Sequence, residues 1–123
     1  MRYALLMHHA EVTDADVDAE MMAQGRAAFD EYGKALVAAG VLVSADVLQP
    51  STATVRVSVR DKMPTVLNGP LETSAEPLTG TIVIDVDDLT AARHWAEKCP
   101  AAAWGTVEIR PVATSLVNGE WTS

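Results

Sequence analysis

Two segments of this chain are apolar on both faces of an expected β-strand, and no other feature restricts the fold as much. From Tyr3 to Met7 every side chain is apolar, so the odd-numbered and the even-numbered positions both favour burial. Residues 80–86 also carry apolar side chains on both faces. Strands of this kind are expected in the middle of a sheet, with both faces covered.

Two amphipathic helices are predicted between strands. The first begins at Thr13, whose hydroxyl can accept hydrogen bonds from the free amides of the first turn, and ends at Gly40. Its apolar positions recur at helical spacing, as Val17, Met21, Ala28, Phe29, Tyr32 and Leu36. The second is capped by Asp87 and Asp88 and ends before Pro100, because proline disfavours the helical conformation in the preceding residue.

Further strands are predicted over residues 41–48, 54–60 and 106–112, with a short edge segment over 64–67. In the segment 54–60, Val55, Val57 and Val59 alternate with polar residues, which is typical of a strand buried on one face. Beyond Ala113 the sequence has no firm pattern. Three apolar residues of this tail would have to be buried by something, namely Leu116, Val117 and Trp121.

The predicted order of elements is β-α-β-β, then a hairpin and loop, then β-α-β. This order predicts an α+β fold of the ferredoxin-like, split β-α-β kind, in which two helices cover one face of an antiparallel sheet. The whole chain, residues 1–123, is expected to form a single domain. Because the central strands are apolar on both faces, the uncovered face is expected to pack on a second copy, which makes a homodimer.

Charge and composition exclude some classes of partner. The net charge is −8, with nine Lys and Arg against 17 Asp and Glu, so a nucleic-acid binder is not expected. No apolar run approaches the roughly 20 residues of a membrane helix, and no signal peptide is visible. Cys99 is the only cysteine, which fits a reducing compartment, so we expect a cytoplasmic protein. The abundance of Ala and Val with few Lys suggests a bacterial source on compositional grounds.

Several separate segments resemble the YCII-related family, in the branch named for a DGPF motif. They are residues 38–43 (AAGVLV), 48–57 (LQPSTATVRV), 68–71 (NGPL), 95–102 (WAEKCPAA) and 107–112 (VEIRPV). The resemblance implies a ferredoxin-like domain that pairs into a dimeric α/β barrel. It implies little about activity, since roles proposed for relatives depend on a His and an Asp that face a cleft.

The chain departs from the pattern of that family where chemistry is concerned. The Asp of the motif is Asn68 here, and its Phe is Leu71. An asparagine amide does not titrate, so Asn68 cannot serve as a general base. The wider family has a His on the first helix, whereas this chain has none between Ala10 and Arg93.

His8 and Asp46 are the candidate catalytic residues. His8 and His9 end the first strand, and adjacent residues on a strand face opposite sides, so one of them at most enters a given pocket. We favour His8 as the acid–base residue, because imidazole titrates near neutrality. Asp46 lies near the end of the second strand, and its carboxylate would pair with His8. The alternatives are a solvated strand end for the histidines and a turn-stabilising role for Asp46.

Five further residues are candidates for substrate binding: His9, Asn68, Gly69, Tyr32 and Trp104. Asn68 and Gly69 could offer an amide and a backbone N–H to a ligand oxygen, or they could simply form a turn. Tyr32 lies in the helical stripe, which favours core packing. His94 is expected on the solvent side of the second helix. The histidines lack metal-ligand spacing, so no metal and no cofactor are expected.

Three functions remain open on the sequence alone. The first is a cofactor-independent enzyme, an isomerase, cyclase or lyase that transfers a proton in a cleft of the dimer. The second is a non-catalytic protein that binds or senses a small molecule and has lost the acidic residue of the motif. The third is a structural subunit whose sheet docks a different protein.

Overall fold

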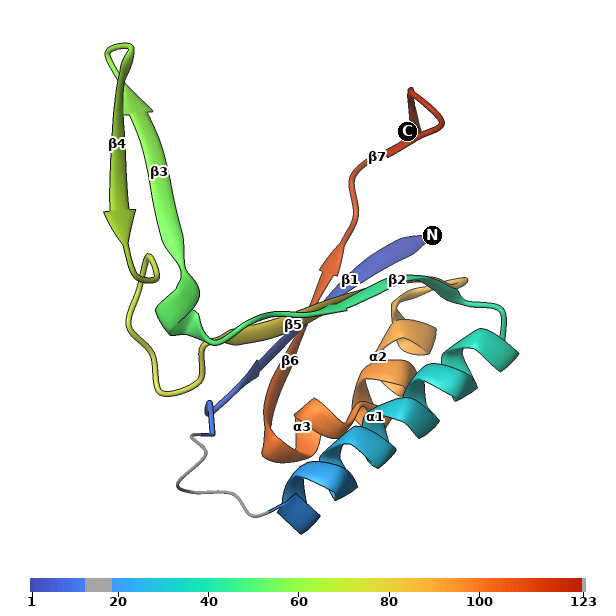
Figure 1. The fold of residues 1–123 in the computed structure, drawn as a ribbon. Coiled ribbons are helices and arrows are strands. Elements are labelled where there is room, and N and C mark those ends of the chain that lie inside the picture. Colours follow the sequence, from blue (N-terminus) through green and yellow to red (C-terminus); the bar gives the residue numbers. More distant parts are fainter. Residues whose placement is uncertain (13–18, 123) are drawn as a thin grey trace.

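A computed structural model of the chain describes residues 1–12 and 19–122. Its centre is a four-stranded antiparallel sheet (Figure 1). The strand order is β2 (Leu42–Val47), β5 (Leu78–Asp85), β1 (Arg2–His9) and β6 (Gly105–Pro111). The two strands predicted to be apolar on both faces, β1 and β5, are the two central ones. Their pairing confirms that prediction.

The helices lie together on one face of this sheet (Figure 1). They are α1 (Ala19–Ala38), α2 (Leu89–Lys98) and a short α3 (Pro100–Trp104). This arrangement confirms the predicted α+β, ferredoxin-like fold. The predicted helix start at Thr13 and the stripe position Val17 lie outside the described residues.

The core forms between the helices and the inward side of the two central strands. It contains Tyr3, Leu5, Met7, Tyr32, Leu36, Ile82, Ile84, Val86, Ala92, Ala96, Cys99 and Ala101. The phenol of Tyr32 donates a hydrogen bond to the carbonyl oxygen of Trp95 at 2.7 Å, so the polar end of this side chain is satisfied. Most core residues come from β1, β5 and the three helices, while Val86 follows β5 and Cys99 lies between α2 and α3. Together they fix the helices against the sheet.

The ends of the helices follow the expected chemistry, with one exception. The carboxylate of Asp88 accepts a hydrogen bond from the Ala91 amide at 2.9 Å and caps α2. Gly40 has φ +72°, the left-handed conformation expected after a helix. Pro100 does end α2, but it is also the first residue of α3, a helix that the sequence analysis missed.

A long hairpin stands apart from the main sheet. It consists of β3 (Val55–Arg60) and β4 (Met63–Asn68), follows a 3-10 turn, η1 (Ser51–Ala53), and is called the arm below. Asp61 and Lys62 form its turn, with φ of 49° and 65°. The prediction that residues 54–60 form a half-buried strand was wrong about burial. Within the described chain nothing covers the arm, and every residue of its two strands is exposed except Arg56.

A second, shorter hairpin forms from the tail. Its strands are β7 (Ser115–Val117) and β8 (Glu120–Thr122), in which Leu116 pairs with Trp121. These two side chains are 56% and 70% exposed, so the expectation that they would be buried was wrong for the single chain. Both hairpins project on the side of the sheet away from the helices (Figure 1).

The face of the sheet opposite the helices, called the open face below, is only partly apolar. Its central positions, Ala4, Leu6 and Val83, are half-buried. Its margins carry polar and charged side chains, namely Ser44, Asp46, Thr106, Glu108 and Arg110. Within the described ranges, no helix has the length and apolar character needed to cross a membrane.

Candidate functional site

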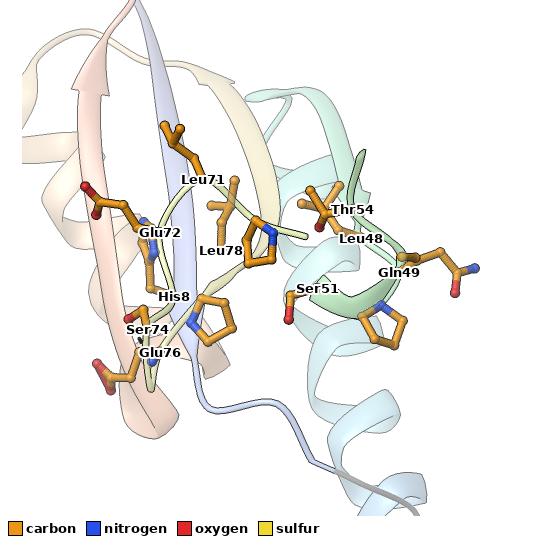
Figure 2. A pocket seen from close by; sticks show the side chains of 14 residues that line it. His8, Leu48, Gln49, Ser51, Thr54, Leu71, Glu72, Ser74, Glu76 and Leu78 are labelled. Atoms are coloured by element: carbon orange, nitrogen blue, oxygen red, sulfur yellow. Dashed lines mark hydrogen bonds between the residues drawn. The ribbon is translucent and has the colours of Figure 1, made fainter. Parts of the chain in front are cut away.

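A pocket of about 650 Å³ lies where the central strand β1 ends (Figure 2). One wall comes from residues between Leu48 and Thr54, which connect β2 to the arm. The other comes from residues between Pro70 and Leu78, which connect the arm to β5. The lining mixes leucine and proline side chains with hydroxyl, amide and carboxylate groups, which is typical of a small-molecule site.

His8 reaches this pocket because of the geometry of β1. It shares the open face with Ala4 and Leu6, since alternate residues of a strand lie on one side. The register between β1 and β5 shifts between Met7 and His8, so that His8 pairs with Leu78 rather than Thr79. Such irregularities re-aim side chains and are frequent beside functional sites.

A carboxylate from the last strand of the sheet lies beside the imidazole. Glu108 Oε1 is 3.3 Å from His8 Nε2, and Glu108 Oε2 is 3.5 Å from Arg110 Nη1. The Glu108 carboxylate therefore lies between an imidazole and a guanidinium on the open face. His8 Nε2 is shielded from solvent, and no described residue makes a well-aligned hydrogen bond to it. Glu108 Oε1 lies within reach of that nitrogen after a small adjustment.

The loop wall of the pocket places acids and hydroxyls near His8. Glu72, Ser74 and Glu76 lie on the His8 side of the pocket, and Ser51 lies across from them (Figure 2). His8 is the only basic side chain among the lining residues. The pocket can therefore present a proton acceptor, two carboxylates and three hydroxyls, those of Ser51, Thr54 and Ser74, to one ligand.

The opposite wall is held by a contact from the segment after β1. Glu11 accepts a hydrogen bond from the Ser51 amide at 2.6 Å and a second from the Ser51 hydroxyl. The hydroxyl, followed by the amide, holds the pKa of Glu11 below its ordinary value, because both bonds favour the ionised form. Glu11 thus links the segment after β1 to η1 at the rim of the pocket.

Asp46, the predicted partner of His8, lies elsewhere on the open face. It is exposed and pairs with Thr81 of β5, which in turn pairs with Leu6 of β1. Two strand spacings, about 10 Å, therefore separate its backbone from β1. The structure does not bring Asp46 together with His8, and Glu108 occupies the place predicted for it.

His9 and Trp104 lie together on the opposite side of β1 from His8. Their rings meet edge to face at 5.7 Å, and Trp104 also packs edge to face on Phe29 at 5.5 Å. The Nδ1 of His9 is 2.9 Å from the carbonyl oxygen of Ala10. Neither His9 nor Trp104 lines the pocket.

Asn68, Gly69 and Tyr32 do not line the pocket either. Asn68 is the exposed last residue of the arm, and the Gly69 amide donates to the Thr54 carbonyl at 2.8 Å. That bond closes the base of the arm, so the amide is not free for a ligand oxygen. Tyr32 is buried in the core, and its burial raises the pKa of its phenol far above the ordinary range.

Two further side chains with reactive groups, Cys99 and His94, lie outside the pocket lining. Cys99 is buried with its Sγ 3.7 Å from the Sδ of Met7, and burial raises the pKa of its thiol. His94 is exposed on α2, as predicted. Across residues 1–12 and 19–122, no three His, Cys, Asp or Glu side chains gather in a way that could hold a metal ion.

Glu108 is the residue that sequence reasoning missed. The alternation of β6 places Thr106, Glu108 and Arg110 on one face, and that much is readable from the sequence. Which strand lies beside β6 is not readable in this way. Only the pairing of β6 with β1 brings Glu108 next to His8.

The fold and the pocket define a class of protein: a ferredoxin-like α+β domain with a pocket at the end of a central strand. The chain belongs to the YCII-related domain family, whose family model matches residues 1–120. A comparison with curated proteins finds no match.

Proposed function

We propose that the chain is an enzyme that acts on a small organic molecule by proton transfer, without a cofactor. The observation that carries this proposal is the pair formed by His8, which faces the pocket, and Glu108, which lies 3.3 Å from its Nε2. After a small adjustment, Glu108 can accept a hydrogen bond from Nε2. A carboxylate bonded in this way fixes the ring and its tautomer, and this leaves the other nitrogen available for a ligand. Membership of the YCII-related family is compatible with an enzyme-like role.

The proposed step uses both nitrogens of His8. With the proton of Nε2 directed at Glu108, the lone pair of Nδ1 accepts a proton from a carbon or oxygen of the ligand. The same nitrogen then returns the proton to a different atom of that ligand, so atoms and charge balance over an isomerisation or a ring closure. Arg110 keeps Glu108 oriented by holding its other oxygen.

The pocket also limits the ligand. A volume of about 650 Å³ suits a small metabolite rather than a polymer. Ser51 and Ser74 can hydrogen-bond its polar groups, while Leu48, Leu71 and Leu78 cover an apolar part. The carboxylates of Glu72 and Glu76 disfavour a ligand that would place a negatively charged group near them.

Proton transfer can be tested before a substrate is known. The protein is incubated in deuterated water with a mixture of small metabolites, and deuterium incorporation is followed by NMR. We expect the wild type to exchange a specific hydrogen of one compound, His8→Ala to lose that exchange, and His94→Ala on the exposed side of α2 to keep it. Exchange that persists in His8→Ala would remove His8 from the mechanism.

A second function, binding without chemistry, is favoured by Asn68. Residues 68–71 support assignment to the DGPF branch, and Asn68 replaces the acid of that motif with an amide that cannot titrate. The contrast is measured by titration calorimetry with the same metabolites. Binding of a compound that shows neither turnover nor deuterium exchange favours this second function, and product formation rejects it.

We also propose that the pocket works within a homodimer in the cytoplasm. The open face carries half-buried Ala4, Leu6 and Val83, which a second copy would cover. The pocket lies at the end of that face, so pairing would enclose it and exclude water from the ligand. The single, buried and unpaired Cys99 suits a reducing compartment.

A further inference from the structure

We propose that the arm, residues 55–68, clasps a second copy of this chain. The inference rests on the homodimer proposed above and adds the element that holds it together. One side of the arm, called the valine face below, carries Val55, Val57 and Val59 from β3 with Val66 and Pro64 from β4. The partner that fits this surface is the acidic body of the second copy, meaning all of that chain outside its own arm.

The valine face is exposed in the single chain to a degree that needs explanation. Val55, Val57, Val59 and Val66 are 57%, 66%, 63% and 61% exposed. A two-stranded hairpin without a packed face is marginally stable in water, because it buries too little apolar surface. A contiguous apolar surface of this kind marks an interaction site. The cross-strand pair Val57–Val66 lies at its centre.

The length of the arm indicates the size of the partner that could cover it. Each strand has six residues, which corresponds to a length of about 20 Å. Packed sheets lie only about 10 Å apart, and a single bound peptide strand is thinner still. A peptide or a small ligand on the open face would leave the outer half of the arm uncovered. A folded domain seated on the open face would lie against its whole length.

The tail hairpin, β7 and β8, is a second element that projects beside the open face. Like the arm, it projects away from the helices (Figure 1). Its Leu116–Trp121 pair is exposed. A body seated on the open face would therefore have the arm and this hairpin as flanking elements. One partner of domain size accounts for three apolar surfaces: the valine face, the centre of the open face and the Leu116–Trp121 pair.

Charge selects a second copy as that partner. The arm holds three of the nine basic residues of the chain, Arg56, Arg60 and Lys62, but only one of its 17 acids, Asp61. The rest of the chain is consequently strongly acidic. Arg56 and Arg60 lie on the side of β3 opposite the valine face, and Lys62 lies in the turn, so these cations do not form the apolar contact themselves. They act at longer range, by attracting the arm to the acidic remainder of a partner, which every copy offers. Two copies related by a two-fold axis would exchange arms and cover both valine faces at once.

The experiment compares two substitutions at neighbouring positions of β3. Val57→Asp places a charge at the centre of the valine face, whereas Ser58→Asp places the same charge on the opposite side of the same strand. Both are made in the full chain, and sedimentation velocity is measured over a concentration series. A third variant, Val57→Thr, keeps the β-branched shape that supports the hairpin.

We expect the wild type and Ser58→Asp to sediment as dimers with dissociation constants within threefold of each other. Val57→Asp should raise the dissociation constant at least tenfold, and Val57→Thr by an intermediate factor. A wild type that stays monomeric overturns both the dimer and the arm. A dimer that Val57→Asp and Val57→Thr leave unchanged overturns the arm alone and leaves the proposed homodimer standing. The deuterium exchange at His8 is measured separately, so a failure of the arm is distinguishable from a failure of the proposed proton transfer.

Discussion

At the scale of single residues, the properties of His8 depend on neighbours that are distant in the sequence. Glu108, near the other end of the chain, has one carboxylate oxygen beside His8. Its other carboxylate oxygen lies beside the guanidinium of Arg110. His8 itself could be singled out from the sequence, since it ends an apolar strand and carries an imidazole. Its partner could not, because Asp46 and Glu108 are both acids on outward positions of strands and only strand pairing decides between them.

Replacing Glu108 tests the pair directly. Glu108→Gln keeps the size of the side chain but removes the charge that favours a proton on Nε2 of His8. We expect the Nε2–H tautomer of neutral His8 to dominate in the wild type and to lose that dominance in the variant. Nitrogen-15 NMR of the histidine rings measures this, with His94 as an internal reference. Identical His8 spectra in both proteins would show that Glu108 does not position the ring.

Glu11 predicts a dependence on pH at the rim of the pocket. Its pKa is below the ordinary value of 4.5 in the folded chain, so its bonds to Ser51 stabilise the fold above that pH. This contribution is lost as the pH falls below 4.5 and through the lowered pKa. We expect the wild type to melt at a higher temperature than Glu11→Gln at neutral pH, and the difference to shrink as the pH falls below 4.5 and through the lowered pKa of Glu11. A difference that grows on acidification would contradict this.

At the scale of elements, periodicity predicted which residues share a face better than it predicted what covers the face. The alternation in residues 54–60 is real, and Val55, Val57 and Val59 do lie on one side of β3. Nothing in that alternation indicates that the strand belongs to a projecting arm rather than to the main sheet. The segments 100–104 and 115–122 were missed because they are short and have no repeating apolar pattern.

Gly105 shows how closely two elements approach beside His8. It pairs with His9 where β6 begins, and a Cβ at this position would lie 2.9 Å from the Cα of His9 and closer still to the carbonyl oxygen of His8. Gly105→Ala would therefore push β6 away from β1 and separate Glu108 from His8. We expect it to lower the free energy of unfolding by about 1–3 kcal/mol in urea titrations.

Gly33→Ala is the matched control for that prediction. Gly33 lies inside α1 with no atom near the place of a Cβ, so alanine fits without a clash. Alanine favours the helix, and we expect a gain of about 0.5–1 kcal/mol in the same titration. Equal effects of the two substitutions would mean that the approach of β6 to His8 is not tight.

At the scale of the whole molecule, charge is distributed unevenly between the arm and the rest of the chain. The total of −8 was known from the sequence and argued against nucleic acid as a partner. The uneven distribution of this charge becomes apparent only from the fold. The arm projects from the sheet, so its basic residues lie at a distance from the acidic remainder of the chain. The fold was thus largely predictable, whereas the surfaces it exposes were not.

Reversing a cation at the tip of the arm tests this distribution. Lys62→Glu should raise the dissociation constant of the dimer by about 3–10-fold at low salt. Arg93→Glu, an exposed site on α2, changes the net charge equally and should have a smaller effect. Added salt should shrink the difference, since it screens exposed charges. Sedimentation at two ionic strengths measures this, and equal effects of the two reversals would contradict a directed attraction.

The turn of the arm has a consequence for how two copies would meet. Asp61 and Lys62 both adopt left-handed backbone conformations, which match the twist of the two strands and close the hairpin within one chain. In the proposed dimer, the fraction of molecules with a closed hairpin would set the apparent affinity, because only those would be competent to associate. A β-branched residue such as Val at position 62 would disfavour that conformation and reduce the competent fraction. Association would then weaken although no residue of the valine face had changed.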